Sequence, residues 1–246
     1  MGSILTELSV SQTLSCPGVQ QIIEAHLEFP NVRLIRECLN CHRDPVKTSI
    51  DTPHLMSDAQ WRAGYALLKR YDLSFDLQLH YTQMEEAAAL AHAFPDTPVV
   101  LNYTGMPVDR QTEEIEVWKK SMTLLASAAN VFCKISGLGM GHWKWTVTSI
   151  RPFVLHAIEA FSAERCMFAR NFPVDKRFSS YDDVFNAFKV ITGTFRYKSE
   201  EHCFMTMQSA STAFDHLHAL ARREKMRDSP SSISEVTGSG RLDVNL

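Results

Sequence analysis

The chain has 246 residues, of which 45% are hydrophobic and 22% are charged, and its formal net charge is -3. This composition is typical of a globular protein with a sizeable core, and the near-neutral charge argues against nucleic acid or an anionic membrane surface as a partner. No apolar run approaches the roughly 20 residues of a membrane span, and the first residues lack the pattern of a secretion signal. We therefore predict a cytoplasmic protein without nucleic-acid or membrane partners.

Strand and helix patterns alternate along the chain. The strand segments are short, apolar and rich in β-branched residues, and the helical segments place apolar residues three and four positions apart. The predicted strands are residues 31–38, 73–79, 97–103, 130–137 and 165–172. The predicted helices are residues 58–72 (with Ser57 as the N-cap), 82–94, 111–129, 147–162, 180–191 and 199–220.

Buried strands that alternate with amphipathic helices indicate a parallel sheet covered by helices, which is an α/β fold of repeated βα units. We assign residues 1–17 to an N-terminal extension and residues 18–222 to a single domain of such units. Residues 223–246 are polar, contain several Ser and Gly residues and show no periodicity. We expect this last segment to be a disordered tail.

Polar residues gather where the predicted strands end. In parallel βα proteins these positions and the loops that follow them line the functional site. The residues concerned are Arg36, Glu37, Asn40, His42, Asp76, Gln78, His80, Asn102, Tyr103, Thr104, Lys134, Ser136, Asn171 and Asp175. We expect them to form one dense polar cluster.

One short motif suggests a different chemistry. Residues 38–42 read Cys-Leu-Asn-Cys-His, the spacing at which c-type haem is attached to a chain. Covalent haem belongs to exported proteins, and a structural zinc site needs four ligands, for which this chain has no second Cys pair. Six cysteines scattered over a chain without an export signal indicate reduced thiols. We expect neither haem nor zinc nor another cofactor.

Four segments resemble the amidohydrolase-related family, which includes lactonases that act on sugar lactones and on pyrone dicarboxylate. They are NVRLIRECLNCHRDP, FDLQLHYTQMEEAAALAHAFPDTPVVLNYTGMPVDR, NVFCKISGLGMGHWKWTVTSIRPFVLHAIEAF and RCMFARNFPVDKRFSSYDDVFNAFK. The resemblance implies a TIM-barrel-like fold of (β/α) repeats. It also implies that Asn40 and His42 carry the family pattern in the first segment, which leaves Cys38 and Cys41 as local substitutions.

The chain departs from the family pattern at several points. It begins close to the family's third strand, so we expect an incomplete barrel that lacks the first one or two strands and the His-x-His metal ligands on them. Tyr103 stands at a histidine position in NYTG, and Asn171 stands in RNFP where many members have the aspartate that activates water. The resemblance therefore implies a metal-independent hydrolase that acts on a lactone or a similar cyclic carbonyl compound in small-molecule metabolism, with no metal site.

Roles follow from the resemblance and from side-chain chemistry. Arg36 is the candidate clamp for a planar anion or oxyanion, His42 or His80 the candidate acid–base, and Asp175 the candidate substitute base. The candidate substrate-binding residues are Asn40, Gln78, Tyr103, Lys134, Ser136, Trp143 and Asn171. The small-molecule substrate is thus expected to bind at the strand ends.

Structural alternatives remain open for each group. The two histidines are equally compatible with capping helices or with hydrogen bonds to backbone carbonyls, and Arg36 and Lys134 with structural ion pairs to Glu37 or Asp76. Tyr103, Trp143 and Trp145 are also compatible with simple pocket walls. For the whole chain, the alternatives are a non-catalytic pseudoenzyme or interaction module, and a truncated product that folds poorly.

An incomplete barrel leaves sheet edges with unsatisfied backbone groups, and such edges need a cover. A second copy of the chain is the simplest one, because most soluble oligomers are symmetric homomers. We therefore expect a homodimer.

Overall fold

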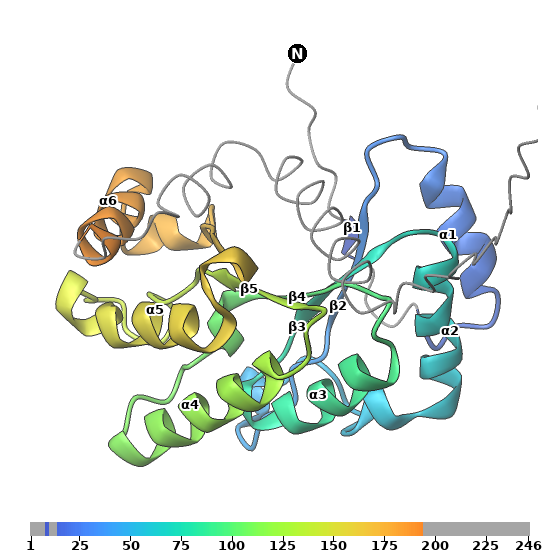
Figure 1. Ribbon diagram of the computed structural model, residues 1–246, viewed down its shortest axis with the longest axis horizontal. Helices are drawn as coiled ribbons and strands as arrows, with labels where there is room; N and C mark the ends of the chain where they lie inside the picture. Colours follow the sequence, from blue (N-terminus) through green and yellow to red (C-terminus); the bar gives the residue numbers. More distant parts are fainter. Residues whose placement is uncertain (1–7, 10–13, 194–246) are drawn as a thin grey trace, which may run out of the picture.

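The computed structural model describes residues 8–9 and 14–193 (Figure 1). Its sheet has six parallel strands, and their order in the sheet is their order in the chain. The strands are β1 (Leu8–Ser9), β2 (Leu34–Cys38), β3 (Ser74–Gln78), β4 (Val99–Leu101), β5 (Val131–Ile135) and β6 (Cys166–Phe168). The five predicted strands are confirmed, and β1 lies within the segment assigned to an N-terminal extension.

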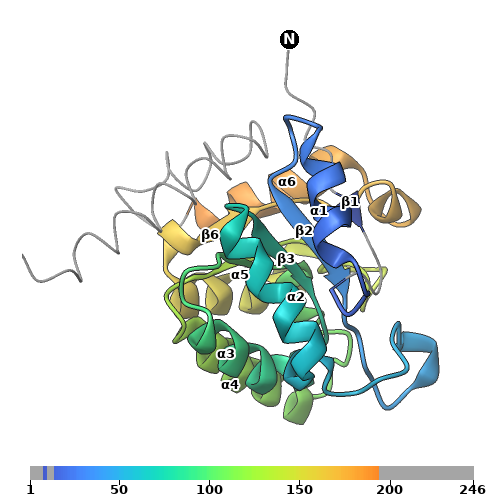
Figure 2. The same cartoon turned by 90° about the vertical axis from the view of Figure 1, so that its right-hand side faces the viewer.

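The helices form an arc around one face of the sheet (Figures 1 and 2). They are α1 (Val19–Leu27), α2 (Ala59–Arg70), α3 (Met84–Ala93), α4 (Thr112–Ala126), α5 (Val147–Phe161) and α6 (Tyr181–Thr192). Short 3-10 turns lie at Pro45–Lys47, Leu55–Ser57, Tyr81–Gln83, Tyr103–Gly105, Ala163–Arg165 and Val174–Arg177. The predicted helix at 199–220 and the tail at 223–246 lie outside the described residues.

Two helix starts differ from the sequence prediction. The N-cap of α2 is Asp58, whose carboxylate accepts the Trp61 backbone N–H at 2.8 Å, so the predicted cap at Ser57 is wrong. Ser57 instead ends the preceding 3-10 turn. Helix α1 was not predicted, because it follows Gly18, which has a φ of 83° and no side chain that could cap the helix.

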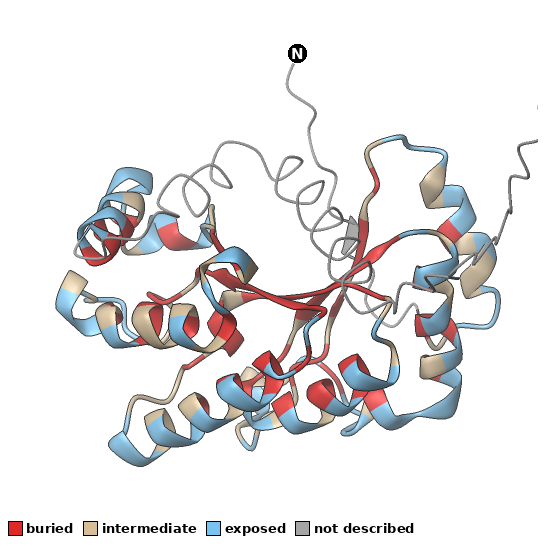
Figure 3. Cartoon of the chain, viewed as in Figure 1, coloured by how far each residue is buried: buried red, intermediate tan, exposed pale blue. Residues whose placement is uncertain are grey.

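The main core lies between the helices and one face of the sheet. Figure 3 shows buried positions along the strands and on the helix surfaces that face them. At its centre the rings of Trp61 and Tyr65 stack 5.2 Å apart, and Phe75 of β3 meets both rings edge-on at 5.8 and 5.1 Å. The alternation of strand side chains therefore gives this face an aromatic and aliphatic layer that anchors the helices.

The opposite face has a different composition. A small apolar cluster of Leu34, Val100, Phe132 and Met167 lies on it. Two residues after Leu34 and two residues after Phe132, on the same face, the strands carry Arg36 and Lys134, and the register places Asp76 between Arg36 and Val100.

Strands β1 and β6 are the two ends of the described sheet, which is therefore not a closed barrel. The α/β class with consecutive parallel βα units is confirmed, and the sheet is compatible with the predicted incomplete barrel. In the part of the chain that the structure describes, no helix is both long and apolar enough to cross a membrane.

Candidate active site

A cluster of three charged side chains lies on the face opposite the helices. The register pairs Arg36 of β2 with Asp76 of β3, and the Arg36 guanidinium contacts Oδ2 of Asp76. Lys134 of β5 reaches the same carboxylate, with its Nζ 2.9 Å from Oδ1. Two cations thus share one fully buried carboxylate. We call Arg36, Asp76 and Lys134 the charge cluster.

The sequence left open whether Arg36 and Lys134 pair with Glu37 or with Asp76, and the structure shows which. Arg36 and Lys134 pair with Asp76 and not with Glu37, which lies on the helix-facing side of β2. Glu37 accepts a hydrogen bond there from the indole Nε1 of Trp61 at 2.9 Å. The two acidic residues therefore serve opposite faces of the sheet.

Three buried polar atoms in the first two residues after β2, β3 and β4 have no hydrogen-bond partner within the described protein. They are Oδ1 of Asn40, Nδ1 of His80 and Nδ2 of Asn102. Asn102 is also tied to the charge cluster, since its Oδ1 lies 3.5 Å from an Arg36 nitrogen. A buried polar atom without a partner costs about 1–3 kcal/mol, so such atoms mark places where a ligand group is favoured.

His80 holds a defined tautomer. Its Nε2 lies 3.0 Å from the carbonyl oxygen of Lys47, which can only accept, so Nε2 carries the proton and Nδ1 presents a lone pair. Burial lowers the pKa of His80, and the nearby charges of His42 and Lys47 act in the same direction. His80 is therefore neutral at pH 7 and able to accept a proton.

His42 has both ring nitrogens occupied. Its Nδ1 accepts the Asp44 backbone N–H at 2.9 Å, and its Nε2 lies 3.3 Å from Oδ2 of Asp109. Lys47 also contacts Asp109, at 2.8 Å, and this hydrogen bond holds the pKa of Asp109 below its usual value. These two hydrogen bonds make His42 a structural residue that holds the loop after β2 in place. The centroid of its ring lies 4.7 Å from that of the His80 ring. Sequence patterns gave no signal for Asp109, because its partners are distant in the chain.

The loop after β4 contains a left-handed turn. Four consecutive residues have positive φ: Tyr103 (52°), Thr104 (53°), Gly105 (69°) and Met106 (50°). Only Gly adopts this region readily, and each other residue there costs on the order of 1 kcal/mol. Thr104 is the least expected of the four, because it is β-branched.

Thr104 holds this turn against the end of β5. Its hydroxyl accepts the Ser136 backbone N–H at 3.3 Å, and its carbonyl accepts the indole N–H of Trp118 at 2.9 Å. The turn packs Tyr103 against Gly137, where an added Cβ would lie 2.8 Å from the Tyr103 ring. Tyr103 and Ser136 are thus brought together, next to the strand that carries Lys134.

Three predicted residues donate to sulfur atoms, one of them Asn171, whose Nδ2 lies 3.0 Å from Sδ of Met140. Gln78 donates from Nε2 to Sγ of Cys38 at 3.1 Å, across the β2–β3 pairing. Asn40 donates from Nδ2 to Sδ of Met106 at 3.2 Å. Gln78 and Asn40 belong to the strands that carry the charge cluster or to the residues that directly follow them.

The residues after β6 form a separate group. The Asn171 backbone N–H donates to Oδ2 of Asp175 at 2.7 Å, and burial raises the pKa of Asp175. Asp175 lines a cavity of about 20 Å³ together with Ile150 of α5 and Phe188 of α6. This volume accommodates about one water molecule. Asp175 therefore packs toward the helices, and none of its described hydrogen bonds reaches the charge cluster.

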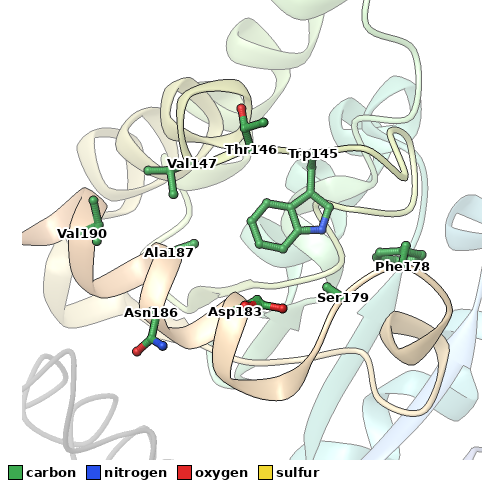
Figure 4. A pocket seen from close by; sticks show the side chains of 9 residues that line it. All are labelled: Trp145, Thr146, Val147, Phe178, Ser179, Asp183, Asn186, Ala187 and Val190. Atoms are coloured by element: carbon green, nitrogen blue, oxygen red, sulfur yellow. The ribbon is translucent and has the colours of Figure 1, made fainter.

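The two tryptophans in the loop after β5 lie near Phe178. Trp143 is 60% exposed and its ring lies 6.5 Å from that of Phe178, with the two planes nearly parallel. Trp145 lines a groove of about 400 Å³ between the beginning of α5 and α6, together with Val147 and Val190 (Figure 4). The structure thus brings Arg36, Lys134, Asn40, His80 and Gln78 to neighbouring strand ends and leaves Trp143 and Asp175 in a different layer.

Parallel strands in chain order, each joined to the next through a helix, with buried polar side chains at their carboxyl ends, are the arrangement of a TIM-barrel-type fold. Comparison with known proteins narrows this fold type to one family. Residues 46–195, more than half of the chain, match the amidohydrolase family model Amidohydro_2. The chain belongs to the amidohydrolase family, as the sequence resemblance predicted.

Two relatives and one solved structure illustrate the likeness. Protein y4mH of Sinorhizobium fredii is 50% identical over 188 residues, which cover 76% of this chain and 63% of that protein. An L-fucono-1,5-lactonase of Burkholderia multivorans is 26% identical over 152 residues, which cover 58% of this chain and 51% of the lactonase. The chain therefore spans less than two thirds of each relative.

The structural likeness is to an amidohydrolase of Burkholderia multivorans crystallised with bound zinc. It has a TM-score of 0.70 at 22% identity and covers 82% of this chain and 70% of the other. This likeness supports the TIM-barrel-type fold of the described sheet and helices.

Proposed function

We propose that the protein hydrolyses a lactone or a similar cyclic carbonyl compound without a metal ion. The charge cluster carries this proposal. Arg36 and Lys134 place two cations around one carboxylate, in the place where amidohydrolase-type barrels act on substrate. This is the arrangement needed to stabilise the oxyanion that forms when a lactone carbonyl is attacked.

The remaining site residues complement such a substrate. The Asn102 amide N–H is oriented by its contact with Arg36 and can donate to a carbonyl or ring oxygen. Oδ1 of Asn40 can accept from a substrate hydroxyl. The similarity to an L-fucono-1,5-lactonase supports a hydroxylated sugar lactone as the substrate class.

His80 is the proposed general base. Its Nδ1 lone pair is buried without a partner in the described protein, and the ring is neutral at pH 7. His42 is less suited to this role because both of its nitrogens are occupied. Asp175 is a second candidate base from the sequence, but its carboxyl packs toward α5 and α6.

The residues present do not fit a divalent ion such as the zinc of the structural relative. Among the described residues, no three His, Cys, Asp or Glu side chains are grouped to hold a metal. The one carboxylate of the charge cluster is already shared by two cations, and their positive charge would repel a further cation. We therefore assign no step of the reaction to a metal.

The test is an assay of L-fucono-1,5-lactone hydrolysis. The protein is first dialysed against a chelator, and proton release is then measured. We expect activity to survive the chelator and to fall about 100-fold in Lys134→Met and Arg36→Met. Lys69→Met on the outer surface of α2, where Lys69 pairs with Asp96, is the matched control and should keep wild-type activity. Activity that requires added zinc, or that is unchanged in Lys134→Met, would contradict the proposal.

The alternative is a non-catalytic module that binds a partner through a sheet edge. Strands β1 and β6 each pair with only one neighbour in the sheet as described, which favours an added strand or a second copy of the chain. Both this alternative and the enzyme proposal include a homodimer, and light scattering measures whether the homodimer forms. A dimer without turnover of any lactone would favour the module.

A further inference from the structure

We propose that Asp109 is a positioning residue that fixes which ring nitrogen of His80 carries the proton. It acts through Lys47 and His42, which both contact the His80 ring. The inference rests on the proposed function, in which His80 is the base, and deepens it. It assigns the site a second carboxylate, outside the charge cluster.

The proton position in His80 depends on a carbonyl from another loop. The residue is buried after β3, and its Nε2 donates to the Lys47 carbonyl oxygen at 3.0 Å. Lys47 ends the 3-10 turn Pro45–Lys47, which lies in the loop after β2. Without an acceptor at that point, either ring nitrogen can hold the proton. The location of the Lys47 backbone therefore decides which nitrogen of His80 remains available to accept a proton.

Asp109 ties this turn to the loop after β4. Its Oδ1 accepts from Nζ of Lys47 at 2.8 Å, and its side chain is only 13% exposed. A partly buried ion pair is screened less by water and salt than a pair on the surface. The Lys47 side chain is thus a tether that keeps its own carbonyl in place beside His80.

The second oxygen of the same carboxylate holds a second neighbour of His80. Oδ2 of Asp109 lies 3.3 Å from Nε2 of His42. The ring centroid of His42 in turn lies 4.7 Å from that of His80. One side chain therefore serves two contacts of the His80 ring, and a change at Asp109 reaches His80 by two routes.

The charge of Asp109 also acts on His80. The hydrogen bond with Lys47 holds the pKa of Asp109 below its usual value against the effect of burial, so the carboxyl is ionised at neutral pH. For His80, burial lowers the pKa most, and the bond to the Lys47 carbonyl raises it. The titratable groups that face the ring are His42 and Lys47, which lower its pKa, and Asp109, which raises it. Loss of the carboxylate should therefore lower the pKa of His80.

Glu114 of α4 offers a matched control. It ties the same loop to the body of the protein, because it accepts from Nη2 of Arg43 at 3.2 Å and from the Tyr81 hydroxyl at 2.5 Å. None of its described hydrogen bonds reaches Lys47 or His80. Glu114→Gln therefore weakens the attachment of the loop without removing the tether.

The first experiment measures the proton position in His80 and needs no turnover. Long-range proton–nitrogen NMR spectra of the full chain report the tautomer and the pKa of each imidazole, and His80→Gln assigns the signals. We expect Asp109→Asn to mix the two tautomers and to lower the pKa of His80 by about half a unit or more. Asp109→Glu keeps the charge and should restore the pKa in part, and Glu114→Gln should change neither quantity. An unchanged tautomer and pKa in Asp109→Asn overturn the positioning role.

A second variant separates the tether from the charge. Lys47→Met keeps the backbone carbonyl but loses the contact with Asp109. It should mix the His80 tautomers as Asp109→Asn does, without lowering the pKa of His80, because a cation beside the ring is removed. This variant also serves as the test if Asp109→Asn does not fold. A single tautomer in Lys47→Met overturns the tether.

The second experiment follows hydrolysis of L-fucono-1,5-lactone as a function of pH. Asp109→Asn should lower kcat about tenfold with little change in KM, and the acid limb of its pH profile should move to lower pH, because His80 must be neutral to act as base. Glu114→Gln should keep the wild-type profile. A fall in kcat with an unmoved acid limb overturns the inference, since loss of loop stability alone would produce it. The expected NMR changes without any lactone turnover by the wild type would support the positioning of His80 and reject the proposed function.

Discussion

The two faces of the sheet differ although the same strands build both. Toward the helices, β3 presents Phe75 to the rings of Trp61 and Tyr65. One residue further along, the same strand presents Asp76 to Arg36 and Lys134 on the opposite face. Strand alternation thus separates the packing that stabilises the fold from the charges available for chemistry.

The largest expected effect is on the apolar face. Phe75→Ala removes a fully buried ring from the aromatic cluster and should lower the free energy of unfolding by about 3–5 kcal/mol. Phe75→Leu keeps most of the volume and should cost about 1 kcal/mol. Urea unfolding followed by circular dichroism measures both. A loss below 1 kcal/mol in Phe75→Ala would mean that this face does not dominate stability.

The next effect concerns the charged face. Asp76→Asn keeps the shape of the side chain but leaves two cations without their carboxylate, and it should destabilise the fold by about 3 kcal/mol. Lys134→Met should cost less, because Arg36 still pairs with Asp76. The double variant should lose less than the sum of the two, and a double-mutant cycle measures this coupling. Strict additivity would show that Lys134 and Asp76 do not interact in solution.

A smaller effect is expected at the left-handed turn between the two faces. Thr104→Val deletes the hydroxyl that accepts the Ser136 N–H and should cost about 1–2 kcal/mol. Thr104→Ser keeps the hydroxyl and is the matched control. Thermal unfolding of both variants checks this, and equal melting temperatures would show that the turn does not depend on the hydroxyl.

The smallest effect, and one that depends on pH, is at Asp175. Because burial raises its pKa, the folded state binds the Asp175 proton more tightly than the unfolded state does. The contribution of Asp175 to stability is therefore greatest at low pH and declines as pH rises from the unfolded pKa, about 3.9, through the folded one.

Asp175→Asn stays neutral at every pH and can accept the same Asn171 N–H. We expect its melting temperature to exceed that of the wild type by about 2 °C at pH 7, with no difference at pH 3. Turnover should be retained. Loss of turnover in Asp175→Asn would instead return Asp175 to the role of base.

The sequence predicts most of the fold because its signals are local. Strands β2 to β6 and helices α2 to α6 each carry their own periodicity, whereas β1 is only two residues long and shows no usable pattern. Helix α1 lacks a side-chain cap. At the start of α2, two adjacent residues, Ser57 and Asp58, both have side chains that can cap a helix. The errors therefore fall where local signals are absent or duplicated.

The site is less accessible to sequence reasoning, because it depends on register. The strand-end residues are identifiable, but only the pairing of β2 with β3 shows that Arg36 meets Asp76 and that Cys38 meets Gln78. The left-handed conformation of Thr104 contradicts its own preference and is imposed by contacts with Trp118 and Ser136. Asn-Tyr-Thr-Gly indicates a turn there but not its handedness.

The order of the strands has a consequence for biosynthesis. Each strand of the described sheet after β1 pairs with the one that precedes it in the chain, so each of these strands leaves the ribosome after its partner has been made. At about 5–20 residues per second, one βα unit follows another within seconds. The sheet can grow by addition at one edge during translation, and no early strand has to wait for a distant late one.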